Sequence, residues 1–196
     1  MIIYFDTETT GLRPGQICQL SYILRDSFGF KTKNFFFSVD SVEYSAYLVH
    51  GFSVNKLKAL SGGKTFADFA EEIAKDFSLA DVIIAHNVDF DLSFLRAEFA
   101  KTNVSFTYKN AFCSMKTAVP VCKIMRSSGK GYKYPKLIEF ATFCGITEGE
   151  ALEKEKEWFG SVSHTHDARL DTALLALCVE NVMVTSEEFK GLLRCI

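Results

Sequence analysis

The chain opens with Met1-Ile2-Ile3-Tyr4-Phe5-Asp6-Thr7-Glu8-Thr9-Thr10-Gly11-Leu12, an apolar run that leads into two acidic residues. Residues 1–5 are rich in strand-favouring side chains and predict a buried strand that opens the fold. Residues two apart in a strand face the same side, so Asp6 and Glu8 point one way, about 6–7 Å apart, and Thr7 points the other way. This spacing suits two cations about 4 Å apart. The alternative is that the two acids mark the place where a buried strand meets water.

Length and composition favour one well-cored domain over residues 1–196, because 48% of the residues are hydrophobic. The sequence contains neither an apolar run of 18 residues nor a basic segment followed by an apolar core at its start, so we expect no membrane span and a cytoplasmic protein. Six cysteines occur without a Cys-x-x-Cys pair, which predicts reduced structural thiols rather than a zinc site or a disulfide framework.

Charge is distributed unevenly along the chain, although the net charge is only -2. The segment 99–138 contains eight basic and no acidic residues, and aromatic residues alternate with the cations. This pattern is typical of a groove that follows a phosphate backbone and stacks bases. A solvated basic face is the alternative interpretation.

Apolar periodicity predicts an α/β protein. Strands are expected at 16–25 and 31–39, forming an antiparallel meander with the first strand, and a further strand at 81–85. Helical patterns occupy 41–60 with a break at Gly51, 66–77, 92–99, 114–125 with a kink at Pro120, 137–144 and 172–184. The acidic segment 148–157 is expected to be a solvated helix or a linker.

A third and a fourth acidic residue follow strand 81–85. Asn87 or Asp89 can cap the next helix, and Asp91 then lies in its first turn, so capping explains one acid but not both. Strand-to-helix turns at the carboxyl end of a sheet are where open α/β sheets place their sites.

The stretch His164-Thr165-His166-Asp167-Ala168-Arg169-Leu170-Asp171 precedes the last apolar helix. On a regular helix His166 and Asp171 would lie about 140° apart, so they can converge only if His166 precedes a helix capped by Asp167. An acid such as Asp171 within an apolar helix needs a partner, and a metal is one such partner.

These three stretches together resemble the motifs of the DEDDh 3′-to-5′ exonucleases of the DnaQ-like, ribonuclease H-like superfamily. The matching residues are Asp6-Thr7-Glu8 with Thr10-Gly11-Leu12, His86-Asn87-x-x-Phe90-Asp91-x-x-Phe94-Leu95, and His166-Asp167-Ala168-x-x-Asp171. The family includes the proofreading epsilon subunit of bacterial DNA polymerase III, ribonuclease T and oligoribonuclease. The resemblance implies a ribonuclease H-like mixed sheet, with three antiparallel strands followed by parallel strands and helices on both faces.

The resemblance also implies roles for individual residues. The metal ligands would be Asp6, Glu8, Asp91 and Asp171, holding two divalent cations, Mg²⁺ or Mn²⁺, and His166 would be the general base, with His164 the weaker candidate. Substrate contacts would be made by Thr7, Thr10, Gly11, Leu12, His50, Asn87 and Phe90. Leu12 would be an apolar wedge against the last bases, with ordinary turn packing as the alternative. For His50, packing in the core is the alternative to a contact with the nucleotide. The epsilon subunit has a glutamate five residues before this histidine, where this chain has Ser45.

The expected activity is therefore metal-dependent release of nucleoside 5′-monophosphates from a 3′ end, with single-stranded DNA favoured over RNA as substrate. The alternatives are an exoribonuclease of the ribonuclease T or oligoribonuclease type and a noncatalytic nucleic-acid-binding domain of the same fold. A proofreading role would need a DNA polymerase as a separate partner chain. The segment 101–136 is the predicted approach path of the single strand.

Overall fold

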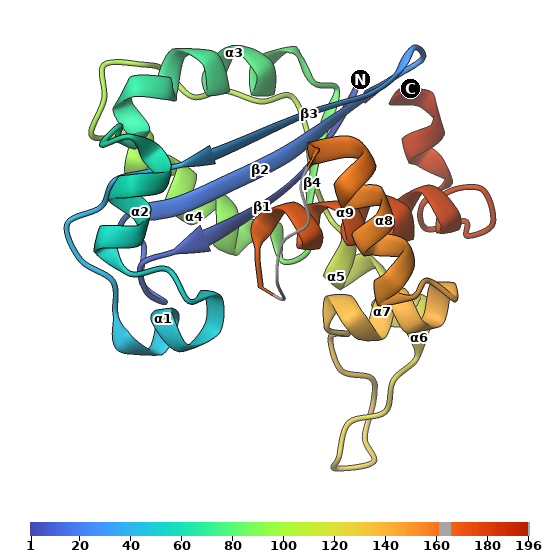
Figure 1. The fold of residues 1–196 in the computed structure, drawn as a ribbon. Coiled ribbons are helices and arrows are strands. Elements are labelled where there is room, and N and C mark those ends of the chain that lie inside the picture. The colour runs from blue at the N-terminus through green and yellow to red at the C-terminus, as the bar shows by residue number, and fades with distance from the viewer. Residues whose placement is uncertain (161–165, 196) are drawn as a thin grey trace.

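A computed structural model describes residues 1–160 and 166–195 (Figure 1). Its five-stranded sheet has the order β3-β2-β1-β4-β5. The strands are β1 (Ile2–Thr9), β2 (Ile17–Asp26), β3 (Gly29–Phe36), β4 (Val82–Ala85) and β5 (Ala111–Cys113). The helices are α1 (Tyr44–His50), α2 (Val54–Ser61), η1 (Phe66–Phe69), α3 (Ala70–Leu79), α4 (Val88–Phe99), α5 (Ser114–Thr117), α6 (Val119–Cys122), α7 (Leu137–Cys144), α8 (Glu148–Phe159), α9 (Ala168–Val182) and η2 (Lys190–Cys195).

The sheet is mixed, as the sequence predicts. Strands β1, β2 and β3 form an antiparallel meander, β4 pairs in parallel with β1, and β5 pairs in parallel with β4. The three-residue strand β5 is not among the predicted strands. Strand β1 lies in the middle of the sheet, so both of its edges are hydrogen-bonded, one to β2 and the other to β4.

Helices cover both faces of the sheet because β1 alternates its side chains between two cores. Ile3 and Phe5 pack with side chains of α3 and α4, whereas Ile2 and Tyr4 pack with side chains of α7 and α9 on the other face (Figure 1). The same alternation continues beyond the apolar run. Thr7 therefore faces α4, and Asp6 and Glu8 face α9.

Most predicted helices are confirmed, with two corrections. Gly51 ends α1 in the left-handed conformation, with φ of 69°, as the predicted break requires. The helix expected over 114–125 is two four-residue turns, α5 and α6, and ends at Cys122. The helix α8, expected to be solvated, buries Glu155 completely. None of the described helices is long and apolar enough to cross a membrane.

An aromatic cluster between the sheet and α3 dominates one core. The fully buried ring of Phe77 lies 5.3 Å from Phe5 and 5.5 Å from Tyr22 between ring centroids, both in edge-to-face geometry. We expect Phe77→Ala to lower the free energy of unfolding by about 3–5 kcal/mol, because it removes these contacts and leaves a cavity. Urea unfolding followed by circular dichroism measures the change.

The matched control is Phe28→Ala, because Phe28 is 95% exposed at the tip of the β2–β3 hairpin. This substitution should change the free energy of unfolding by no more than about 0.5 kcal/mol. Equal losses in the two variants would contradict the assignment of Phe77 to the core.

Candidate active site

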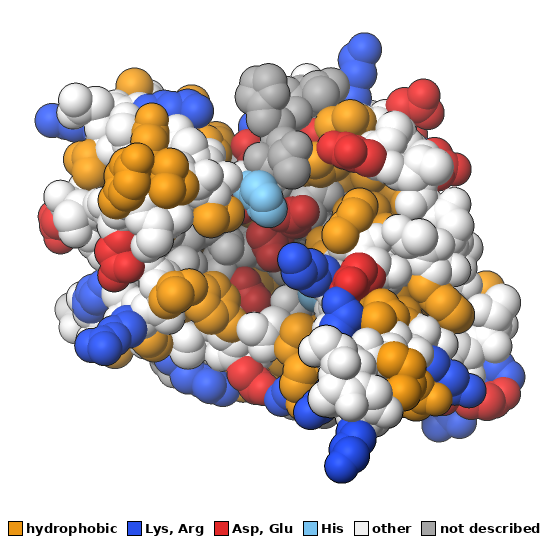
Figure 2. Space-filling model, turned by 90° about the horizontal axis from the view of Figure 1, so that it is seen from below, with side chains coloured by type: hydrophobic (Ala, Val, Ile, Leu, Met, Phe, Trp, Pro, Cys, Tyr) orange, Lys and Arg blue, Asp and Glu red, His pale blue; other side chains and the backbone are white. Residues whose placement is uncertain are grey.

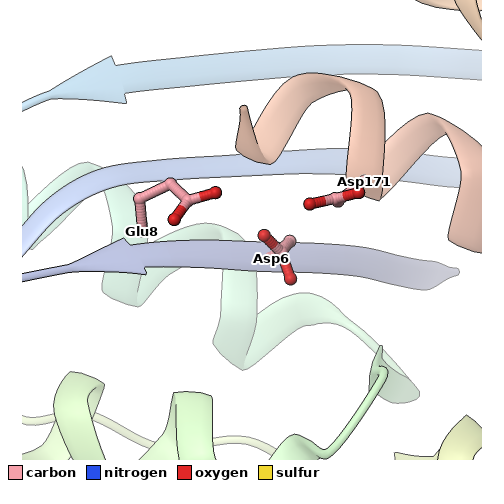
Figure 3. A group of neighbouring side chains, drawn as sticks. All are labelled: Asp6, Glu8 and Asp171. Atoms are coloured by element: carbon pink, nitrogen blue, oxygen red, sulfur yellow. The ribbon is translucent and has the colours of Figure 1, made fainter. Parts of the chain in front are cut away.

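Three carboxyl groups converge where α9 crosses β1 (Figure 3). One potential ligand oxygen from each of Asp6, Glu8 and Asp171 lies within 4.8 Å of the other two. Asp6 and Glu8 meet Asp171 because they lie on the face of β1 that α9 covers. Carboxylate oxygens in this arrangement are the ligands that hard divalent cations prefer.

The start of α9 is fixed by its cap and by a contact with β2. The side chain of Asp167 accepts a hydrogen bond from the backbone N–H of Arg169 at 3.0 Å, as predicted for a helix cap. The amide of Gln19 on β2 donates to Asp167 Oδ1 at 2.8 Å and accepts from the N–H of Ala168 at 3.2 Å. Gln19 thus holds the first turn of α9 against the sheet, and these contacts fix the position of Asp171 along β1.

Arg169 reinforces the same turn. Its Nε and Nη2 atoms donate to the two oxygens of Asp167 at 2.9 and 2.8 Å, and its Nε lies 3.8 Å from Glu155 Oε1 on α8. Burial alone would raise the pKa of Asp167, but the hydrogen bonds from Arg169 and Gln19 hold it below its ordinary value. Asp167 therefore remains a carboxylate, the charge state that this cap requires.

Sequence reasoning did not find Gln19, Glu155 or Arg169 as supports of the site. The available signals were a polar residue within an otherwise apolar strand and an arginine inside the third motif. Neither signal identifies a partner until the tertiary structure brings β2 and α8 against α9.

The clustered carboxyl groups repel one another in a buried setting. Burial, followed by the nearby charges of Asp171 and Asp91, raises the pKa of Asp6 well above its ordinary value. Burial and the charge of Asp171 do the same to Glu8, and burial raises the pKa of Asp171 to about 6. Such a group binds either protons or cations at neutral pH, so these residues fit a divalent metal site.

Asp91 approaches the cluster from α4, on the other face of β1. It is 3% exposed, and its Oδ1 accepts a hydrogen bond from the Thr7 hydroxyl at 2.7 Å. Burial raises its pKa to about 7, although the hydrogen bonds from Thr7 act in the opposite direction. Asp91 is not one of the three residues within 4.8 Å of one another, so its role as the fourth ligand stays a prediction.

His166 precedes α9, as convergence with Asp171 requires. It is an exposed residue with φ of 60°, and it lines a cavity of about 420 Å³ together with Asp6, Asp171 and Lys136. Figure 2 shows a histidine at the edge of a hollow whose floor carries acidic side chains. The role of His166 as general base stays a prediction, and His164 lies outside the described residues.

A second cavity, of about 320 Å³, lies on the other side of Glu8. Five of the predicted substrate contacts line it: Thr7, Gly11, Leu12, His50 and Phe90. Leu12 is 79% exposed, which contradicts ordinary turn packing and leaves its side chain available as a wedge. An added Cβ at Gly11 would lie 2.3 Å from Glu43 Oε1, so a larger residue here would displace the end of the exposed Glu43 side chain.

His50 is held by the backbone on both sides of its ring. Its Nδ1 accepts a hydrogen bond from the N–H of Phe52 at 3.0 Å, and its Nε2 lies 3.2 Å from the carbonyl oxygen of Thr9, to which it donates. Burial lowers the pKa of His50, which favours the neutral ring that these contacts require. The packing interpretation is therefore supported, and a contact with nucleotide stays a prediction that rests on its place in the second cavity.

The remaining predicted contacts, Thr10 and Asn87, do not line the second cavity. The hydroxyl of Thr10 donates to the carbonyl oxygen of Gln16 at 3.1 Å, within the turn after β1. Asn87 precedes α4 with φ of 86°, and its side chain makes no capping hydrogen bond. Asp89 does not cap α4 either, because it lies in the first turn and pairs with Lys116.

Comparison with known proteins identifies the fold. No protein-family model matches the chain, and no curated protein matches it by sequence. The chain is similar to a solved structure, the metal-free form of the E. coli ExoI–ssDNA complex, with a TM-score of 0.70 and 20% sequence identity. The match covers 98% of this chain and 42% of the ExoI chain, so the chain spans less than half the length of that protein. It confirms the predicted ribonuclease H-like fold.

The raised pKa of Asp171 gives a pH prediction for the metal-free protein. A carboxyl group whose pKa is raised by folding destabilises the folded state once it ionises, so the contribution of Asp171 should lower stability as pH rises from about 4 to about 6 and stay constant above that. We expect Asp171→Asn to raise the free energy of unfolding by about 1–3 kcal/mol at pH 8 and by much less near pH 4. Urea unfolding in EDTA at both values measures this difference.

Divalent cations should restore the stability that the protein loses when these carboxyl groups ionise. Because bound cations neutralise the repulsion, Mn²⁺ should raise the melting temperature of the wild type more than that of Asp171→Asn. Asp26→Asn, in the hairpin at the opposite end of the sheet, is the matched control. A wild type whose stability is unchanged between the two pH values would contradict the raised pKa.

Proposed function

We propose that this chain is a metal-dependent 3′-to-5′ exonuclease that releases nucleoside 5′-monophosphates from single-stranded DNA. The observation that carries the proposal is the convergence of Asp6, Glu8 and Asp171 at the β1–α9 contact of a ribonuclease H-like fold. The nuclease is proposed to reside in one domain over residues 1–196, in the cytoplasm.

The acidic cluster supports two divalent cations, Mg²⁺ or Mn²⁺, as cofactors. Asp6, Glu8 and Asp171 would hold them, with Asp91 as the fourth ligand from the opposite face of β1. When bound, two such cations activate a water and stabilise the departing 3′-oxygen in an in-line displacement. The hydrogen bond from Thr7 fixes the orientation of Asp91, so this ligand would be positioned before any cation arrives.

His166 is proposed to accept the proton of the attacking water. The ring belongs to an exposed residue at the edge of the cavity that also contains Asp6 and Asp171, so solvent can carry the proton away. Histidine is the side chain most often used for such proton transfer. The cap at Asp167 holds the end of the segment that carries the ring.

The second cavity is proposed to hold the 3′-terminal nucleotide. Leu12 and Phe90 offer apolar surfaces to a base, and Glu8 links this cavity to the acidic cluster. A terminal nucleotide bound here would leave its 5′-phosphate at the cluster. This arrangement would give cleavage from the 3′ end with a nucleoside 5′-monophosphate as product.

Single-stranded DNA is favoured as substrate because the similar ExoI structure is a complex with ssDNA. RNA is the second candidate, since the family that the motifs resemble also includes exoribonucleases. Proofreading with a DNA polymerase partner and a noncatalytic binding role are the other possibilities that the first experiment addresses.

The first experiment follows 5′-labelled single-stranded DNA and RNA of the same sequence with Mg²⁺ or Mn²⁺. We expect stepwise shortening from the 3′ end, faster on DNA, and no shortening in EDTA. Asp6→Asn should abolish the reaction, and His166→Ala should slow it by about 10²–10⁴-fold, the usual contribution of a general base.

Asp26→Asn should retain full activity, because this aspartate lies at the end of the sheet far from Glu8. Faster shortening of RNA would replace the DNA assignment by the exoribonuclease one. If the folded wild type shortens neither strand but binds both, the protein is a noncatalytic nucleic-acid-binding domain.

A further inference from the structure

The chain between α6 and α7 leaves the body of the protein as a narrow arm over residues 123–136 (Figure 1). Its two sides are paired: the N–H of Lys133 donates to the carbonyl oxygen of Ile124 at 2.9 Å, and that of Arg126 donates to Gly131 at 3.1 Å. An antiparallel bridge joins Met125 and Tyr132 between these bonds. The arm is thus a hairpin with a defined backbone, and its tip at 127–131 is exposed throughout.

The arm carries five basic residues and no acidic residue: Lys123, Arg126, Lys130, Lys133 and Lys136. Lys133 pairs with Glu139. Within the part of the chain that the structure describes, the other four form no ion pair with a carboxylate. Tyr132 and Tyr134 are 41% and 55% exposed, so the arm also presents aromatic surface. Cations interleaved with exposed aromatic rings suit the phosphates and bases of a single strand.

The structure divides the basic segment 101–136 into two parts. Lys101, Lys109 and Lys116 are paired with acids outside the segment, namely Glu98, Asp81 and Asp89. Asp81 immediately precedes β4, so Lys109 lies at the end of the sheet opposite to the acidic cluster. The aromatic residue Phe106 stacks on Phe99, with 4.4 Å between ring centroids. The cations and the ring of this part of the segment are thus already paired within the protein. Residues 123–136 are the part that is left to bind a nucleic acid.

The root of the arm is attached to the candidate active site. The carbonyl oxygen of Pro135 accepts a hydrogen bond from Nε2 of His86 at 2.9 Å. His86 is the residue that directly follows β4. Lys136, the next residue, lines the same cavity as Asp6 and His166. Figure 2 shows basic side chains next to the acidic floor of the hollow. A chain that follows the arm from its tip to its root would therefore arrive at the catalytic carboxylates.

We infer that the arm 123–136 binds the phosphate backbone of the single strand on the 5′ side of the cleaved nucleotide and guides it to the acidic cluster. The inference rests on the proposed exonuclease function for the direction of the strand. Positive charge along the arm would offset the repulsion between the strand and the acidic site. The arm would act on strands long enough to reach its tip, whereas a dinucleotide would be held by the cavities alone.

The test compares two double variants from the same basic segment. Arg126→Ala with Lys130→Ala removes two cations from the arm, and Lys101→Ala with Lys109→Ala removes two paired cations elsewhere. Binding of a fluorescent 20-nucleotide DNA strand is measured by anisotropy in EDTA over a range of salt concentrations. We expect the arm variant to bind at least about tenfold more weakly in low salt and its log–log salt slope to fall by about 1.4, whereas the control stays close to wild type.

Hydrolysis of a dinucleotide with Mn²⁺ is the second readout. It should be unchanged in the arm variant, because Arg126 and Lys130 lie near the exposed tip of the arm and do not line the cavities that hold so short a substrate. Wild-type binding of the long strand by the arm variant would overturn the inference and leave the arm as a surface for an acidic protein. Equal losses in the two double variants would overturn it as well. If the wild type hydrolyses nothing but the arm variant still binds more weakly, the exonuclease proposal and the direction of the strand fail, whereas binding of the strand by the arm stands.

Discussion

Repulsion between carboxyl groups at the contact of β1 with α9 is the constraint on which the site depends. Burial raises the pKa values of Asp6, Glu8 and Asp171, and the charge of Asp171 raises those of Asp6 and Glu8 further, so this contact is costly in the ionised, metal-free protein. The surrounding core offsets that cost: both faces of β1 are covered by fully buried apolar side chains. The packing of the central strand β1 therefore stabilises the fold against the repulsion of the carboxyl groups that it carries.

The position of α9 is the second element of this support. Gln19 holds the first turn of the helix to β2, and Arg169 joins its cap at Asp167 to Glu155 on α8. The hydroxyl of Thr172 adds a contact of 3.3 Å to the carbonyl oxygen of Ser21. Because these contacts come from two different elements, β2 and α8, a helix that carries one carboxylate is kept in register with a strand that carries two. Orientation of this kind by surrounding hydrogen bonds is what a metal site needs for defined geometry.

The acidic cluster lies between two cavities of different character. The cavity with Leu12 and Phe90 is suited to a nucleoside, and the other contains His166 and Lys136. The root of the arm joins the cavity of His166 and Lys136 through the contact between His86 and Pro135. In the proposed arrangement, a strand would extend from the arm, across the carboxylates, into the second cavity, which contains Leu12 and Phe90. This path would account for the combination of an acidic centre and a basic, aromatic segment in a chain of nearly neutral net charge.

The sequence by itself determined most of the element order and the shared face of Asp6 and Glu8, because strand alternation and helix capping are local rules. The expectation that Asp171 joins them came from the resemblance of the three motifs to those of the DEDDh exonucleases. Asp6 and Glu8 had to share a face, and His166 had to precede a helix capped by Asp167. Strand β5 escaped prediction because three residues, Ala111–Cys113, are too few to show a period. Tertiary structure alone decided that Asp91 approaches from the opposite face with Thr7 as its donor, since this depends on which helix covers which side of β1. It alone divided the basic segment as well, because only long-range contacts show that Lys109 is paired with Asp81 while Lys136 lines the site.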